Sequence, residues 1–221
     1  NRASGASRDS VVSKVVDMAG HPQFEYPYGV LIASLYALMA QRHMHEYGTT
    51  PEQLARVAVT FRQHASLNPN ALMRQPIAVG DVLNSKMIAT PLHLLDCCLV
   101  SDFGGSLIVT SAERARDLKQ KPVYILGIGE GHTHEHVSQA PTLVSSGAKR
   151  SGELAFRMAG LTPADVDVAE LYDCFTITVL IELEDLGFVP KGETGPFVES
   201  GAIDLGGKLP VNTYGGMLSA V

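Results

Sequence analysis

The sequence has 221 residues, of which 45% are hydrophobic and 18% charged, so it can bury a core and is not a disordered tail. Its 17 basic and 23 acidic side chains give a formal net charge of −6. This argues against nucleic acid as the main partner, because phosphate binding needs a clustered cationic face. Three cysteines form no disulfide framework and indicate a reducing, cytoplasmic compartment.

No apolar run approaches the ~20 residues that a membrane span needs, so no membrane partner is expected. The sequence begins without Met and stops just after a glycine pair, and we expect it to be part of a longer polypeptide.

The first part of the sequence predicts helices and no clear strand. Ser10 is a candidate N-cap for a helix over 11–19, and a long helix is predicted over 29–47, ended by Gly48. Thr50 is the predicted cap of a further helix over 51–67, whose apolar residues recur at helical spacing.

Strands and helices alternate in the rest of the chain. Strands are predicted over 106–110, 122–128 and 168–171. Helices are predicted from Ser111, over 145–159 and over 175–186, with a helical turn over 162–165, while 190–207 is predicted to be loop. This order favours an α/β fold, a sheet covered by helices.

Two motifs near the end of the second predicted strand are candidates for ligand binding. The histidines of the run 132–136 alternate, so three imidazoles could converge on a metal, but a polar surface loop is the favoured interpretation. The glycines of 127–131 follow a strand, yet no helix follows them directly, so a dinucleotide site is rejected.

The segment 170–176 sits where a predicted strand ends and a helix begins, the edge at which α/β sheets bind ligands. Tyr172 could donate a hydrogen bond or act as acid or base. Asp173 is interpreted as a cap of the following helix. Cys174 could be a nucleophile, but packing is the more common role for such a cysteine.

A second candidate segment is 212–216. Its paired glycines, Gly215 and Gly216, permit backbone conformations closed to other residues, and they let a ligand approach closely. An ordinary tight turn explains the pattern equally well. The adjacent Cys97 and Cys98 point to opposite sides of an extended chain, so they are interpreted as packing residues rather than a metal site.

Several of these stretches together resemble the thiolase superfamily, and most closely its lipid-transfer-protein and sterol-carrier-thiolase branch. The resemblance rests on 42–50, 67–71, 95–98, 101–102, 131–136 and 165–176. It implies a five-layered α-β-α-β-α thiolase fold of two similar halves, incomplete in this chain. Residues 1–86 would then be a helical loop domain, 87–120 the end of the N-terminal half and 121–221 the C-terminal half.

Tyr172 stands where the family usually has Asn or His, as in the thiolase-like aldolases that cleave steroid side chains. The resemblance therefore implies retro-aldol cleavage of a β-hydroxyacyl-CoA, with Tyr172 as catalytic residue. It implies no cofactor beyond the coenzyme A of the substrate, and no metal. The substrate-binding candidates are His132, Asn212, Tyr214, Gly215 and Gly216.

The same resemblance implies a homodimer and a small OB-fold partner protein. Two alternatives stay open. One is an acetyl-CoA acyltransferase that uses a cysteine upstream of this sequence, and the other is a non-catalytic acyl-CoA or lipid-binding protein.

Overall fold

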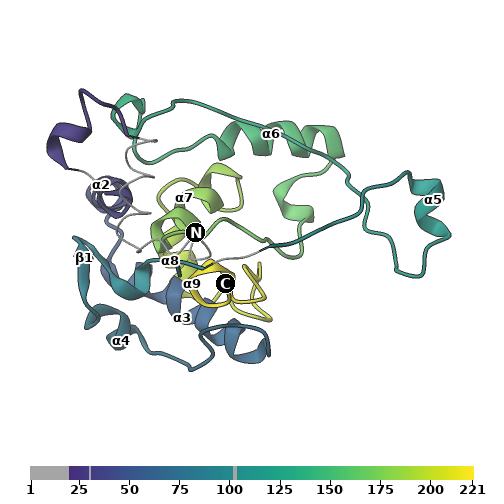
Figure 1. The fold of residues 1–221 in the computed structure, drawn as a ribbon, viewed down its shortest axis with the longest axis horizontal. Helices are drawn as coiled ribbons and strands as arrows, with labels where there is room; N and C mark the ends of the chain where they lie inside the picture. The colour runs from purple at the N-terminus through teal and green to yellow at the C-terminus, as the bar shows by residue number, and fades with distance from the viewer. Residues whose placement is uncertain (1–19, 30, 102–103) are drawn as a thin grey trace.

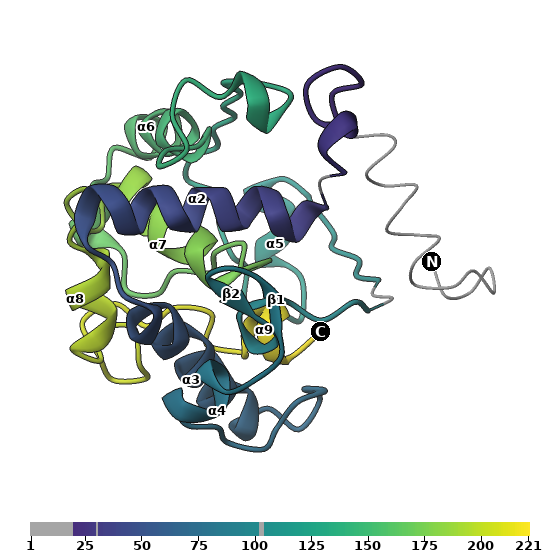
Figure 2. The same ribbon diagram turned by 90° about the vertical axis from the view of Figure 1, so that its left-hand side faces the viewer.

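The computed structural model describes residues 20–29, 31–101 and 104–221, so the helix expected over 11–19 lies outside the described residues. Helices dominate; α3 and α7 lie toward the middle of the body, and α2 lies on one side of it (Figure 1), as the view in Figure 2 shows along its length. The elements are η2 (Tyr26–Tyr28), α2 (Ile32–Tyr47), α3 (Pro51–Leu67), α4 (Val79–Leu83), β1 (Met87–Ala89), β2 (Leu92–His93), η3 (Leu94–Asp96), α5 (Ala112–Arg116), η4 (Val137–Gln139), α6 (Ala148–Ala159), η5 (Pro163–Asp165), α7 (Thr176–Asp185), α8 (Thr194–Glu199) and α9 (Gly216–Ser219).

Local capping chemistry sets the ends of the first two long helices. Gly48 adopts a left-handed φ of 72° and ends α2, as predicted. The Thr50 hydroxyl accepts the Gln53 N–H at 3.3 Å, and the Gln53 side chain accepts the Thr50 N–H at 3.1 Å. α2 begins at Ile32, later than predicted, because Gly29 has a left-handed φ of 63° that closes the turn before it.

The hydrophobic core lies where α3 packs against α7. Leu54, Val57 and Phe61 of α3 and Ile177 and Leu180 of α7 have exposures of 1% or less and belong to one cluster. Each such side chain contributes roughly 1.5–3 kcal/mol of transfer free energy. The core therefore fixes the position of α7, whose N-terminal end follows Tyr172.

The three predicted strands are wrong for the residues that the structure describes. The sheet there is the two-stranded antiparallel pair β1–β2, and of 168–171 only a single parallel bridge between Ala169 and Val211 is formed. Residues 106–110 and 122–128 are extended but without a described neighbour to pair with, and Ile108 and Val123 are 91% and 95% exposed. An apolar sequence indicates that its side chains favour burial. A strand also needs a neighbouring strand to pair with its backbone N–H and C=O groups, and composition does not show whether one is available.

These extended segments run to and from α5, which projects away from the body of the molecule (Figure 1). The helical predictions fared better. Ser111 caps α5 by accepting the Arg114 N–H at 3.3 Å, α6 ends at the left-handed Gly160, and the turn η5 forms where predicted. No helix in the described ranges combines the length and apolar character of a bilayer span.

The glycines of 127–131 have a packing role. A Cβ on Gly129 would lie 1.9 Å from the carbonyl oxygen of Ser151, and one on Gly127 would lie 2.1 Å from that of Ala155. Both carbonyls belong to α6. Alternate glycines on one face of the extended segment thus allow α6 to lie directly on its backbone.

The prediction of loop over 190–207 is wrong for 194–199, which form α8, and is confirmed for the rest of that stretch. Pro196 in the first turn is compatible with a helix, since an N–H there has no intrahelical partner. The Thr194 hydroxyl donates to the Leu180 carbonyl at 3.3 Å and also contacts the Glu184 carboxylate. These two bonds join the start of α8 to α7.

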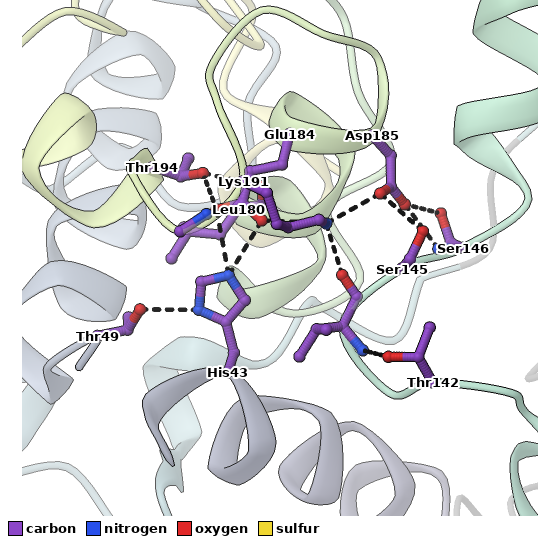
Figure 3. Close-up of polar contacts among 12 residues, drawn as sticks. His43, Thr49, Thr142, Ser145, Ser146, Leu180, Glu184, Asp185, Lys191 and Thr194 are labelled. Atoms are coloured by element: carbon purple, nitrogen blue, oxygen red, sulfur yellow. Dashed lines mark hydrogen bonds and ion pairs between the residues drawn. The ribbon is translucent and has the colours of Figure 1, made fainter. Parts of the chain in front are cut away.

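A buried polar network ties α2 to α7 (Figure 3). The His43 ring contacts the Thr49 hydroxyl at 2.7 Å through Nδ1 and both oxygens of Glu184 at 3.2 Å through Nε2. Lys191 Nζ lies 3.1 Å from Glu184 and 2.9 Å from Asp185. The Glu184 side chain is fully buried, and each of its oxygens has a partner.

Candidate active site

Four consecutive residues, 171–174, form the centre of the candidate site, and each is held by a different part of the fold. Asn212 holds the first of them. Its Oδ1 accepts the Leu171 N–H at 2.7 Å and its Nδ2 donates to the Leu171 carbonyl at 3.0 Å. Asn212 is fully buried with a positive φ of 49°. Its amide thus serves the backbone of this segment, and its role as a substrate contact stays a prediction.

Tyr172 and Cys174 are anchored through their backbones. The Tyr172 N–H donates to Glu182 Oε2 at 3.1 Å, a bond from the strand-like segment into the second half of α7. The Cys174 carbonyl accepts the Cys98 N–H at 2.9 Å, next to an antiparallel bridge between Cys97 and Phe175. The backbone of the segment is therefore preorganised, which fixes the point from which the Tyr172 side chain extends.

Asp173 does not cap the helix that follows it, so that prediction is corrected. Its fully buried carboxylate accepts the N–H groups of Met217 at 2.8 Å and Leu218 at 3.0 Å, which are in the first turn of α9. It therefore caps a helix far along the chain, a choice that only the tertiary fold makes. Burial raises the pKa of Asp173 even though these hydrogen bonds favour its ionised form.

The paired glycines are required by geometry. Gly216 has a φ of 63°, and a Cβ there would lie 2.0 Å from Asp173 Oδ2. Gly215 has a φ of 112°, and a Cβ there would lie 2.6 Å from the Ala65 side chain. The tight turn is therefore present, and the group that approaches Gly216 is the protein's own Asp173. The role of Gly215 and Gly216 in binding substrate stays a prediction.

The phenol of Tyr172 is accessible, since the residue is 53% exposed. Burial of the remainder, the thiols of Cys174 and Cys98, and the Asp173 carboxylate raise the pKa of Tyr172 to about 12. The hydroxyl is therefore protonated at neutral pH, and although the raised pKa makes it a weak acid, it can donate a hydrogen bond or give its proton to a strong base such as an enolate. Cys174 is 5% exposed, and burial raises the pKa of its thiol, which fits a packing residue better than a nucleophile.

Tyr214 is also close enough to Asp173 to be influenced by its charge. Burial, then the carboxylates of Asp173 and Glu170, raise the pKa of Tyr214. This tyrosine lines a pocket of about 400 Å³ together with Asn68, Leu72, Ser101, Val221 and two further residues. Tyr172 is not among the residues that line this pocket.

His132 stands apart from this group. Its ring contacts the Glu130 carboxylate at 2.9 Å, and both side chains are at least 80% exposed. His134 contacts the Thr133 hydroxyl at 2.7 Å instead of joining His132. Within the described part of the chain, no three His, Cys, Asp or Glu side chains are placed to hold a metal ion. The proposed surface loop agrees with this arrangement.

Glu182 is a site residue that the sequence analysis missed. Burial raises its pKa to about 7 despite the hydrogen bond from Tyr172, and the carboxylates of Asp173 and Asp185 add to the shift. The available signal was weak: a glutamate between Ile181 and Leu183 in an apolar helix. Its contact with Tyr172 depends on how the segment before α7 lies against that helix, which the sequence does not display.

Comparison with known proteins identifies the class of fold to which this chain belongs. Residues 129–221 match the family described as "Thiolase C-terminal domain-like". The solved "Ltp2-ChsH2(DUF35) aldolase" superposes with a TM-score of 0.82 at 42% identity, covering 85% of this chain and 51% of that one. The fold is thus a thiolase fold of which the chain carries a part.

Two curated relatives show the range of proteins that this chain resembles. The "17-hydroxy-3-oxo-4-pregnene-20-carboxyl-CoA lyase" of Mycobacterium tuberculosis is 41% identical over 99% of this chain and 59% of its own length. An "Acetyl-CoA acetyltransferase" of Methanothermobacter thermautotrophicus is 41% identical over 90% of this chain and 52% of its own. The chain belongs to the thiolase superfamily, in the branch of the sterol-carrier thiolases and steroid side-chain aldolases. It spans between half and three-fifths of the length of these relatives.

Proposed function

We propose that this chain is part of a thiolase-like aldolase that cleaves a β-hydroxyacyl-CoA by a retro-aldol reaction. The observation that carries the proposal is Tyr172, an accessible and protonated phenol on a segment that is anchored through the backbone of residues 171, 172 and 174 and through the Asp173 carboxylate. The names of the aldolase and lyase relatives support the reaction class and a CoA thioester as substrate.

The reaction requires one base and one acid. A base takes the proton of the β-hydroxyl, the bond between the α- and β-carbons breaks, and a carbonyl forms at the β-carbon. The electron pair moves to the α-carbon as a thioester enolate, which an acid then protonates. A phenol with its pKa raised to about 12 is mostly neutral at pH 7, so Tyr172 supplies the proton in this scheme. Acid–base chemistry alone balances these steps, and no cofactor beyond the coenzyme A of the substrate is proposed.

The proposal includes protein partners. The name of the aldolase structure joins two components, which supports a partner protein for this chain. We propose that this partner is a small OB-fold protein, and we propose a homodimer in addition. The apolar residues of 106–110 and 122–128 are largely exposed and offer a surface suited to protein contacts. We also propose a cytoplasmic location, as the low cysteine count favours.

Replacing Tyr172 with Phe tests the proposal. In the complete polypeptide with its partner, Tyr172→Phe should lower kcat for β-hydroxyacyl-CoA cleavage by about 10²–10⁴-fold, since it removes the acid and keeps the ring. Tyr28→Phe is the matched control, because Tyr28 is 80% exposed and lies in η2, outside both the candidate site and the proposed contact surface. Unchanged turnover in Tyr172→Phe would exclude this role.

A second candidate, an acyltransferase, is favoured by the acetyl-CoA acetyltransferase relative. It uses a cysteine nucleophile and needs no acid at position 172. Incubation with a β-ketoacyl-CoA and coenzyme A separates the two. Thiolysis without cleavage of a β-hydroxyacyl-CoA would favour the acyltransferase.

A further inference from the structure

The groups that hydrogen-bond to residues 171–174 differ in whether they can gain or lose a proton. Leu171 is held by the Asn212 amide, and the Cys174 carbonyl by a backbone N–H, and neither group titrates. At Asp173 the titratable group is the buried side chain of the residue itself, which accepts two backbone N–H groups. Tyr172 alone is anchored by a carboxylate that is only half-buried, that of Glu182.

The surroundings of Glu182 contain acids and weak acids. Asp185 lies on the same helix, Asp173 lies on the anchored segment, and Tyr36 comes from α2. The Cys174 thiol lies 3.3 Å from the Thr178 hydroxyl, and the charge of Glu182 contributes to raising the pKa of this thiol. Among the described residues, no Lys, Arg or His forms an ion pair with Glu182.

Glu184, two residues along α7, shows the opposite arrangement. It contacts His43, Lys191 and Thr194, and although burial opposes its ionisation, these contacts lower its pKa. Burial without such partners raises the pKa of Glu182 to about 7. Glu184 is therefore charged at neutral pH, while Glu182 gains and loses its proton in the neutral range.

We propose that Glu182 is a positioning residue for Tyr172, whose ionised carboxylate holds the Tyr172 backbone in place and whose protonation loosens that hold. The inference rests on the proposed role of Tyr172 in catalysis. A hydrogen bond to an ionised acceptor is shorter and stronger than one to a neutral acceptor. Activity therefore rises as the pH increases through the ionisation of Glu182.

The Glu182→Gln variant mimics the protonated state, because its amide oxygen still accepts the Tyr172 N–H but carries no charge. In the complete enzyme, kcat/KM of the wild type should rise roughly tenfold with one ionisation near pH 7. Glu182→Gln should stay at the low-pH level throughout, and Glu182→Asp should regain a pH dependence. The control Glu153→Gln removes an exposed carboxylate from α6 and should keep the wild-type profile.

A second measurement does not depend on activity. The amide shift of Tyr172 in NMR spectra should follow a titration near pH 7 in the wild type and stay constant in Glu182→Gln. An unchanged pH profile in Glu182→Gln, or a Tyr172 amide that does not titrate, would overturn the inference. If the amide titrates but the wild type cleaves no β-hydroxyacyl-CoA at any pH, the proposed function fails and the positioning bond stands.

Discussion

Gly216 is the residue at which the candidate site is most tightly constrained. Its φ of 63° and the 2.0 Å approach of Asp173 Oδ2 to the position of a Cβ act together. Gly216→Ala should lose about 1–2 kcal/mol to backbone strain. Displacing Asp173 should cost a further ~1–3 kcal/mol, which denaturant unfolding would measure.

Gly206→Ala separates the two effects. Gly206 has a φ of 83°, but nothing lies within 4 Å of a Cβ built there. This variant should show the strain alone. Equal losses of unfolding free energy in the two variants would mean that contact with Asp173 contributes nothing.

For individual residues, the sequence indicates which residues are site candidates better than it indicates their hydrogen-bond partners. Tyr172 and the glycine pair were selected because tyrosine and glycine have distinctive chemistry and conformational range. The partners of Asp173 and Glu182 were not predictable. A carboxylate can cap any nearby helix, and the choice of α9 or of the Tyr172 N–H arises from packing between distant segments.

Among the elements, α6 and the extended segment beneath it depend on a stripe of glycines. Gly129→Ala would place a Cβ 1.9 Å from the Ser151 carbonyl, which is backbone and cannot rotate away. The helix must shift, so the variant should lose roughly 1–3 kcal/mol of unfolding free energy. Hydrogen exchange should become faster in α6 than in α3.

Gly104→Ala is the control for that experiment. Gly104 is also in an extended segment, but nothing lies within 4 Å of its Cβ position. Its substitution should leave both stability and the exchange of α6 unchanged. If Gly129→Ala behaved in the same way, the glycine stripe would not be what allows α6 to pack closely.

Helices were predictable because their signals are local. Thr50 with Gln53, Ser111, Gly48 and Gly160 each specify an end through neighbouring residues. The strand predictions over 106–110 and 122–128 failed for the opposite reason. Their apolar composition is a local property, whereas hydrogen-bonded neighbours belong to the whole fold, and the described chain provides none for them.

For the molecule as a whole, the network around Glu184 predicts how stability depends on pH. It joins residues far apart in sequence, from His43 on α2 to Lys191 before α8 (Figure 3). The contacts of Glu184 lower its pKa below the ordinary value of 4.5 despite its burial. A depressed pKa contributes stability above the unfolded-state pKa, and this contribution disappears as the pH falls through the folded-state pKa.

Glu184→Gln should therefore have two effects on the unfolding free energy. At neutral pH it removes the negative charge of a buried carboxylate that contacts His43 and pairs with the partly exposed Lys191, which should cost on the order of 1–3 kcal/mol. Below about pH 5 the free energy of the wild type should fall more steeply than that of the variant, because the variant has no proton to bind at this site. Glu193→Gln, an exposed glutamate beside the network, should keep the wild-type slope. Parallel acid slopes in Glu184→Gln and the wild type would show that other carboxylates govern the acid unfolding of the fold.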